Sequence, residues 1–173
     1  MHGTVRLSDF CAFSGDSLGN FQLKRRTGKV PFAVPEGAYQ HHRYAAPDFL
    51  AQQLLDALRG HGLGVRPAAQ AVLASRAAPE FLARLARGED VADLVLVEAR
   101  EWDDSGAVAQ EVRRASCVRA SDLAPLLSAE ARPILSAVVV PILPAWRAAI
   151  DRADAVGLEL LPGSVARKGG RDG

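Results

Sequence analysis

Residues 7–28, LSDFCAFSGDSLGNFQLKRRTG, predict two short helices joined by a tight turn. Ser8 is a suitable N-cap for the first helix, because its hydroxyl can accept a hydrogen bond from an early backbone N–H. Gly15 then breaks this helix, and Ser17 is placed to cap a second helix that continues to about Thr27. This is the spacing of a helix-turn-helix. The apolar positions at helical spacing, which we expect to face inward, are Leu7, Phe10, Cys11, Leu18 and Phe21.

Residues 29–44 follow with an irregular pattern of apolar and turn residues. Pro35, Glu36 and Gly37 favour a turn between two short apolar segments. We therefore expect two short strands that form a wing beside the helix pair.

Three further helices are predicted after the wing. Asp48 lies in the first turn of the earliest one, near the positive end of the helix dipole, and residues 60–62 end it. Pro67 and Pro79 start the other two, because proline fits the first turn of a helix.

The pattern changes at about residue 91. Residues 93–102 are rich in β-branched and aromatic side chains, residues 103–106 form a turn, and residues 107–118 can return as an antiparallel strand. A buried strand is expected over 137–143, followed by a helix that Pro144 opens. This part of the chain therefore predicts a small α+β module.

The overall charge of the 173 residues, +1, conceals an asymmetry. Residues 1–66 hold eight basic and five acidic side chains, a net charge of +3, and residues 67–173 carry −2. Seven acidic residues lie between positions 89 and 110, against the single Arg100. The asymmetry indicates an anionic partner for the first part of the chain, and a solvated basic face is the alternative.

Composition excludes several classes of protein. With 49% hydrophobic residues the chain is folded, but it has no apolar run of about 18 residues that could span a membrane. We expect a cytoplasmic protein, because the first ten residues lack the apolar stretch of a signal peptide. Cys11 and Cys117 fit free thiols in a reducing compartment, and a disulfide between them is the alternative.

No motif for catalysis or for metal binding is present. The adjacent His41 and His42 would point to different sides of a strand, and the sequence has neither an HExxH nor a CxxC spacing. It also lacks the GxSxG motif of a nucleophile elbow and the GxxxxGK[ST] motif of a phosphate loop. We therefore expect no catalytic residues, no metal and no cofactor, and a protein that is not an enzyme.

Three segments together resemble the winged helix-turn-helix DNA-binding domain of MerR-like regulators, particularly the divergent versions in phage and proteobacterial genomes. These are residues 7–28, residues 42–48 (HRYAAPD) and residues 62–69 (GLGVRPAA), under half of the chain. The residues that match the family's pattern most specifically are Arg43, Tyr44 and Asp48.

The chain also departs from the family's pattern. Asp16 stands where an apolar residue is usual, Leu23 or Lys24 replaces the expected aromatic residue of the recognition helix, and the wing is unusually apolar. The metal-binding cysteines and long coiled-coil helix of the metal-sensing members are missing from the sequence. The resemblance therefore implies DNA binding and not effector sensing.

The resemblance and the patterns together give an α+β fold with four parts. These are a MerR-like winged helix-turn-helix over 1–75, a helical linker over 76–90, a small α+β module for dimerisation or partner contact over 91–161, and a disordered tail over 162–173.

Double-stranded DNA is the expected partner, because amide and cationic side chains on a short helix can contact base edges and phosphates. A homodimer is also expected, since one winged helix makes few contacts; the apolar segments 94–97 and 137–143 are the candidate surfaces. The expected DNA-binding residues are Asn20, Gln22, Lys24 and Arg25 at base edges and adjacent phosphates, Ser17 and Gly19 at the start of the helix, and Arg26, His41, Arg43 and Tyr44 at the backbone.

Each of these features has a simpler explanation. Residues 24–26 could be a solvated helix end, and Tyr44 could be a core residue with its hydroxyl at the rim. A second functional class is a protein-interaction module, in which the acidic region 89–110 docks RNA polymerase or another regulator and the winged helix is only a scaffold. A third is a regulator with a small-molecule pocket in its C-terminal module.

Overall fold

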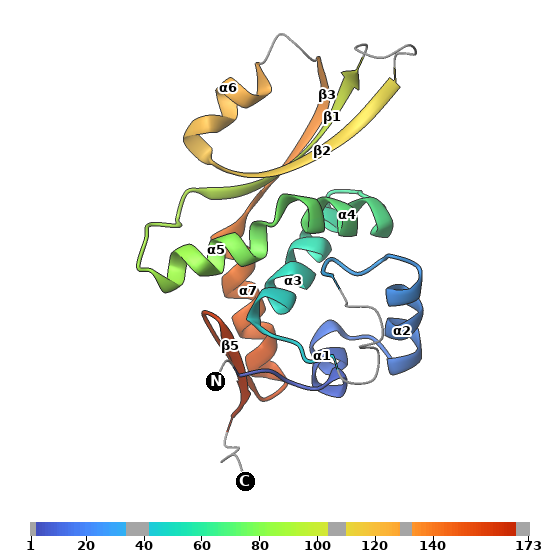
Figure 1. Ribbon diagram of the computed structural model, residues 1–173, viewed down its shortest axis with the longest axis vertical. Coiled ribbons are helices and arrows are strands. Elements are labelled where there is room, and N and C mark those ends of the chain that lie inside the picture. Colours follow the sequence, from blue (N-terminus) through green and yellow to red (C-terminus); the bar gives the residue numbers. More distant parts are fainter. Residues whose placement is uncertain (1–2, 34–41, 104–109, 129–132, 169–173) are drawn as a thin grey trace.

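The computed structural model describes residues 3–33, 42–103, 110–128 and 133–168, and within them the chain has an α+β fold (Figure 1). The described residues form seven α-helices, a three-stranded antiparallel sheet and a C-terminal β-hairpin. The helices are α1 (Leu7–Ser14), α2 (Leu18–Arg26), α3 (Ala46–Gly60), α4 (Val65–Ser75), α5 (Ala77–Ala86), α6 (Leu123–Leu127) and α7 (Ile142–Ala155). The strands are β1 (Leu94–Asp103), β2 (Gln110–Arg119), β3 (Ile134–Pro141), β4 (Leu158–Leu161) and β5 (Ser164–Arg167).

The two predicted N-terminal helices are present, and a tight turn joins them. Gly15 ends α1 with φ +72°, a left-handed conformation that glycine adopts without strain. The Ser17 hydroxyl accepts a hydrogen bond from the backbone N–H of Asn20 at 3.3 Å, so the predicted cap of α2 is confirmed. The predicted cap of α1 is wrong. Ser8 lies inside the helix, and the carboxylate of Asp9 instead accepts the N–H of Arg6 at the N-cap, at 3.3 Å.

An aromatic cluster holds these helices to the rest of the chain. The ring of Phe10 lies 5.3 Å from that of Phe21 in α2, 5.0 Å from that of Phe49 in α3 and 4.4 Å from that of Tyr44 (centroid distances), and all four side chains are fully buried. The prediction that Leu18 faces inward is wrong: it is 52% exposed, because Phe21 already fills the inward side of α2.

Part of the predicted wing, including its turn at residues 35–37, lies outside the described residues. Of its two flanks, residues 30–32 form a bend rather than a strand. Tyr44 forms an isolated antiparallel bridge with Val5, with N–H to O distances of 2.9 and 3.0 Å. The described end of the wing region is therefore joined to the segment that precedes α1.

The three predicted central helices are confirmed as α3, α4 and α5. Asp48 lies in the first turn of α3, as expected, and its carboxylate accepts the N–H of Ala45 at 2.8 Å. Pro67 and Pro79 are each the third residue of their helix. Arg76 separates α4 from α5 with φ +53°, which ends one helix and begins the next within one residue.

The sheet lies at the opposite end of the molecule from α1 and α2 (Figure 1), with strand order β2-β1-β3. The predicted hairpin of β1 and β2 is confirmed, with Leu94 opposite Arg119 and Asp103 opposite Gln110. Because β1 is the central strand, residues 94–97 are buried inside the chain, at most 6% exposed. They cannot serve as the dimer surface that the sequence suggested.

The C-terminal hairpin differs from the sequence prediction. Residues 164–167, expected in a disordered tail, form β5 and pair with β4. Val165 explains this order, since it is 1% exposed and its backbone N–H donates to the carbonyl of Gly3 at 3.0 Å. The hairpin follows α7, which packs against α3, and β5 lies beside the segment that precedes α1 (Figure 1).

Candidate nucleic-acid interface

The outward side of α2 is the surface that the sequence predicts to contact DNA. Gln22 and Arg26 lie one turn apart on this side, and both are exposed. Leu18 and Leu23 lie beside them, each 52% exposed. Two apolar and two polar side chains thus share one open helix surface, since the buried Phe21 ties the other side of α2 to the core.

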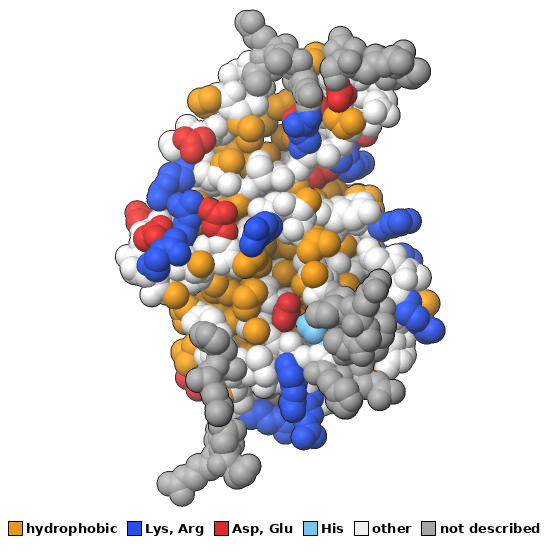
Figure 2. All heavy atoms as spheres, in the orientation of Figure 1, with side chains coloured by type: hydrophobic (Ala, Val, Ile, Leu, Met, Phe, Trp, Pro, Cys, Tyr) orange, Lys and Arg blue, Asp and Glu red, His pale blue; other side chains and the backbone are white. Residues whose placement is uncertain are grey.

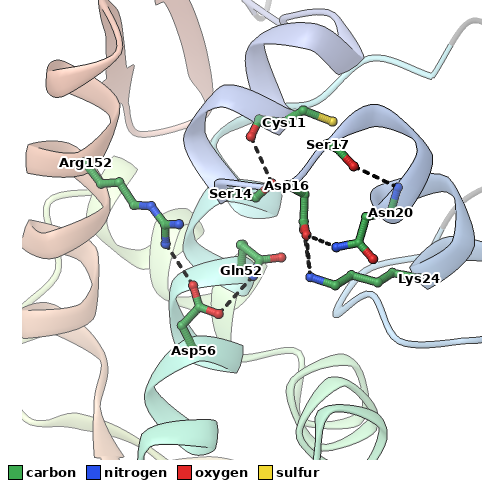
Figure 3. Close-up of polar contacts among 9 residues, drawn as sticks. All are labelled: Cys11, Ser14, Asp16, Ser17, Asn20, Lys24, Gln52, Asp56 and Arg152. Atoms are coloured by element: carbon green, nitrogen blue, oxygen red, sulfur yellow. Dashed lines mark hydrogen bonds and ion pairs between the residues drawn. The ribbon is translucent and has the colours of Figure 1, made fainter.

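Two of the predicted contact residues are bound by their own chain. The carboxylate of Asp16 accepts hydrogen bonds from the side-chain amide of Asn20 at 2.6 Å and from the ammonium of Lys24 at 2.7 and 2.8 Å (Figure 3). The side chain of Asp16 is only 7% exposed, so it is a fixed part of the turn between α1 and α2. Asp16 therefore neutralises a lysine that was expected to face DNA.

Arg25 also turns away from the outward side. It is half-buried, and its positive charge acts on His42 and Tyr44. Burial first, and then this charge, hold the pKa of His42 below its usual range. The sequence predicts Arg25 at the DNA surface, but in the structure this side chain lies on the inner side of the helix.

Tyr44 is a core residue, the simpler of the two roles that the sequence allowed. Its side chain has no exposed surface, and its ring stacks on that of Phe10. Burial raises the pKa of its hydroxyl to about 12. Tyr44 therefore positions its neighbours and offers no surface to a phosphate.

The remaining predicted residues lie in three places. Ser17 and Gly19 are exposed at the start of α2. The space around Gly19 is open, because no other part of the described chain comes within 4 Å of the point where a Cβ atom would lie. Arg43 is exposed beside the segment that precedes α1, and His41 lies outside the described residues. Among the described residues, neither Arg26 nor Arg43 has an ion-pair partner within 4.0 Å.

Sequence reasoning missed the outward position of Leu18 and Leu23. A helical wheel anchored on Phe21 indicates the outward position of Leu23, two residues after the anchor, but not that of Leu18, because residues three apart share a helix face. It also missed Lys29, which is exposed just after α2 and extends the positive charge of this edge.

The described residues show neither a metal site nor a reactive thiol. They contain no group of three or more His, Cys, Asp or Glu side chains that could hold a metal ion. Burial raises the pKa of both thiols, that of Cys117 to about 11, which keeps them protonated and unreactive at neutral pH. No helix within the described ranges is long and apolar enough to cross a bilayer.

Comparison with known proteins finds no family that matches the chain and no curated protein that is similar to it.

Proposed function

We propose that this protein is a sequence-specific DNA-binding transcription regulator whose helices α1 and α2 form a helix-turn-helix of the MerR-like kind. The observation that carries the proposal is the outward side of α2, where Gln22 and Arg26 are exposed one turn apart with no acidic partner among the described residues. A helix of this width fits the major groove of B-form DNA.

The side chains on this surface match the chemistry of base edges. An arginine can bond to the O6 and N7 of guanine, and a glutamine can bond to the N6 and N7 of adenine. Leu18 and Leu23 add apolar surface of the kind that contacts the methyl group of thymine. Four side chains read few base pairs, so we also propose that the protein acts as a homodimer on a repeated site.

Ion pairs in and beside the sheet argue against the alternative of an acidic docking module. Four acidic residues in the region 89–110 are paired with arginines of the same chain: Glu89 with Arg87, Asp93 with Arg119, Glu98 with Arg113, and Glu101 with Arg114. Their charge is therefore neutralised locally, and little of it is left to attract a basic partner.

Fluorescence anisotropy with mixed genomic duplex fragments tests the proposal. We expect the wild type to bind at about 50 mM salt and to weaken steeply by about 200 mM. A Gln22→Ala/Arg26→Ala variant should bind at least about ten-fold more weakly, because it loses two base-contacting side chains. The control is Arg147→Ala, which removes the same charge from the exposed side of α7 and should bind like the wild type. Equal binding by the α2 variant, or no binding by the wild type at low salt, would contradict the proposal.

The bond between Asp16 and Lys24 gives a second prediction. Asp16→Asn should raise duplex affinity by roughly three- to ten-fold and steepen the salt dependence by about one phosphate contact, because it releases the ammonium of Lys24 and removes a negative charge. Asp93→Asn is the matched control, since it releases Arg119 from a 2.7 Å ion pair at the sheet end of the molecule and should leave affinity unchanged. Unchanged binding by Asp16→Asn would mean that Lys24 lies outside the interface.

A further inference from the structure

A cleft of about 480 Å³ opens between the segment that precedes α1 and strand β5. Three arginines line it, each from a different part of the chain: Arg6 before α1, Arg43 before α3, and Arg167 in β5. Lys and Arg side chains gather at this lower edge of the molecule, beneath α1 (Figure 2).

Backbone pairing fixes the walls of the cleft. Val5 is bridged to Tyr44 on one side, and Gly3 accepts the N–H of Val165 on the other. The approach at Gly3 is close, because a side-chain carbon there would lie 2.6 Å from the carbonyl oxygen of Val165. A main-chain hydrogen bond therefore holds the hairpin to the segment before α1, and the hairpin brings Arg167 to the same cleft as Arg6 and Arg43.

The cleft keeps an excess of positive charge. Asp9 is the one acidic residue that lines it, and its carboxylate pairs with Arg167 and also accepts the N–H of Arg6. In the part of the chain that is described, Arg6 and Arg43 have no ion-pair partner. Three guanidinium groups therefore face one carboxylate.

We infer that this cleft binds a phosphate of the DNA backbone, so that the C-terminal hairpin is part of the DNA-binding surface; the inference rests on the proposed function. Guanidinium groups donate planar pairs of hydrogen bonds that match phosphate oxygens. A backbone phosphate also suits an open cleft whose cations come from separate elements, because such contacts position a duplex without reading its sequence. Arg43, which the sequence predicts to contact the DNA backbone, is one of the residues that line this cleft.

The test compares an Arg6→Gln/Arg167→Gln variant with a control of equal charge, Arg59→Gln/Arg147→Gln, whose arginines are exposed on α3 and α7. Thermal unfolding first establishes that both variants fold. Duplex affinity is then measured between about 50 and 200 mM salt. We expect the cleft variant to lower the salt-dependence slope by about 0.9 for each lost contact and the affinity by about ten-fold per contact at 50 mM salt. The control should change neither.

Each outcome separates this inference from the proposed function. A cleft variant that behaves like the control, while Gln22→Ala/Arg26→Ala loses affinity, overturns the inference and leaves the proposed function standing. A wild type that binds no duplex overturns both. In a further arm, about 10 mM inorganic phosphate replaces chloride at constant ionic strength. Suppose that phosphate raises the melting temperature of the wild type and not of the cleft variant, and that the two proteins show equal salt dependence of duplex binding. The cleft then binds free phosphate, and the assignment to DNA is wrong.

Discussion

Replacing Phe10 with alanine is expected to lower the free energy of unfolding by about 4 kcal/mol. The side chain is fully buried, and its ring contacts aromatic rings from four other parts of the chain. The variant loses the transfer free energy of a phenyl group, and the cavity left behind cannot collapse, because its walls are rings anchored in separate elements. These rings belong to Phe13, Phe21, Phe32, Tyr44 and Phe49.

Urea unfolding followed by circular dichroism measures this effect. Leu23→Ala is the control, because that leucine is half exposed on α2 and its loss should change stability by less than about 0.5 kcal/mol. A loss below about 1.5 kcal/mol for Phe10→Ala would show that the cluster repacks, and that α1 and α2 are not held to α3 by this ring.

Local chemistry made most of the elements predictable. The cap at Ser17 and the glycine at position 15 define the turn between α1 and α2 without reference to the rest of the chain. Pro67 and Pro79 mark the starts of α4 and α5 to within two residues for the same reason. The pairing of β1 with β2 follows from their β-branched residues and from the turn that the sequence predicts over 103–106.

Contacts between distant residues were not predictable. Composition favours disorder after residue 161, but β5 is ordered by its pairing with β4 and by the hydrogen bond from Val165 to Gly3. Arg167 and Asp9 are 158 positions apart in sequence, so no spacing rule could bring them together. The ion pair of Lys24 was missed for the same reason, because its charge is visible in the sequence but its partner, Asp16, depends on how the turn folds.

Asp48→Asn is expected to stabilise the protein by about 2 kcal/mol at pH 7.5 and to leave its stability unchanged near pH 3.5. Burial raises the pKa of the Asp48 carboxyl from 3.8 to about 6, and the hydrogen bond from Ala45 offsets this only in part. A raised pKa means that the native state binds the proton more tightly than the unfolded state. Wild-type stability therefore falls as the pH rises from about 4 to 6 and is flat above that.

Asparagine keeps an oxygen that can accept the N–H of Ala45, but it does not titrate. The stability of the variant should therefore not fall between pH 4 and 6. The variant also lacks the attraction between a carboxylate and the start of α3, and this reduces the gain in stability by about 0.5–1 kcal/mol. Asp56→Asn provides the contrast, because that carboxylate pairs with Arg152 at 2.8 Å and its loss should cost up to about 1 kcal/mol at pH 7.5. Urea unfolding of the three proteins at both pH values separates the two effects. If Asp48→Asn were destabilising at pH 7.5, the charged carboxylate would be the form that α3 requires, and attraction to the helix dipole would outweigh burial at this position.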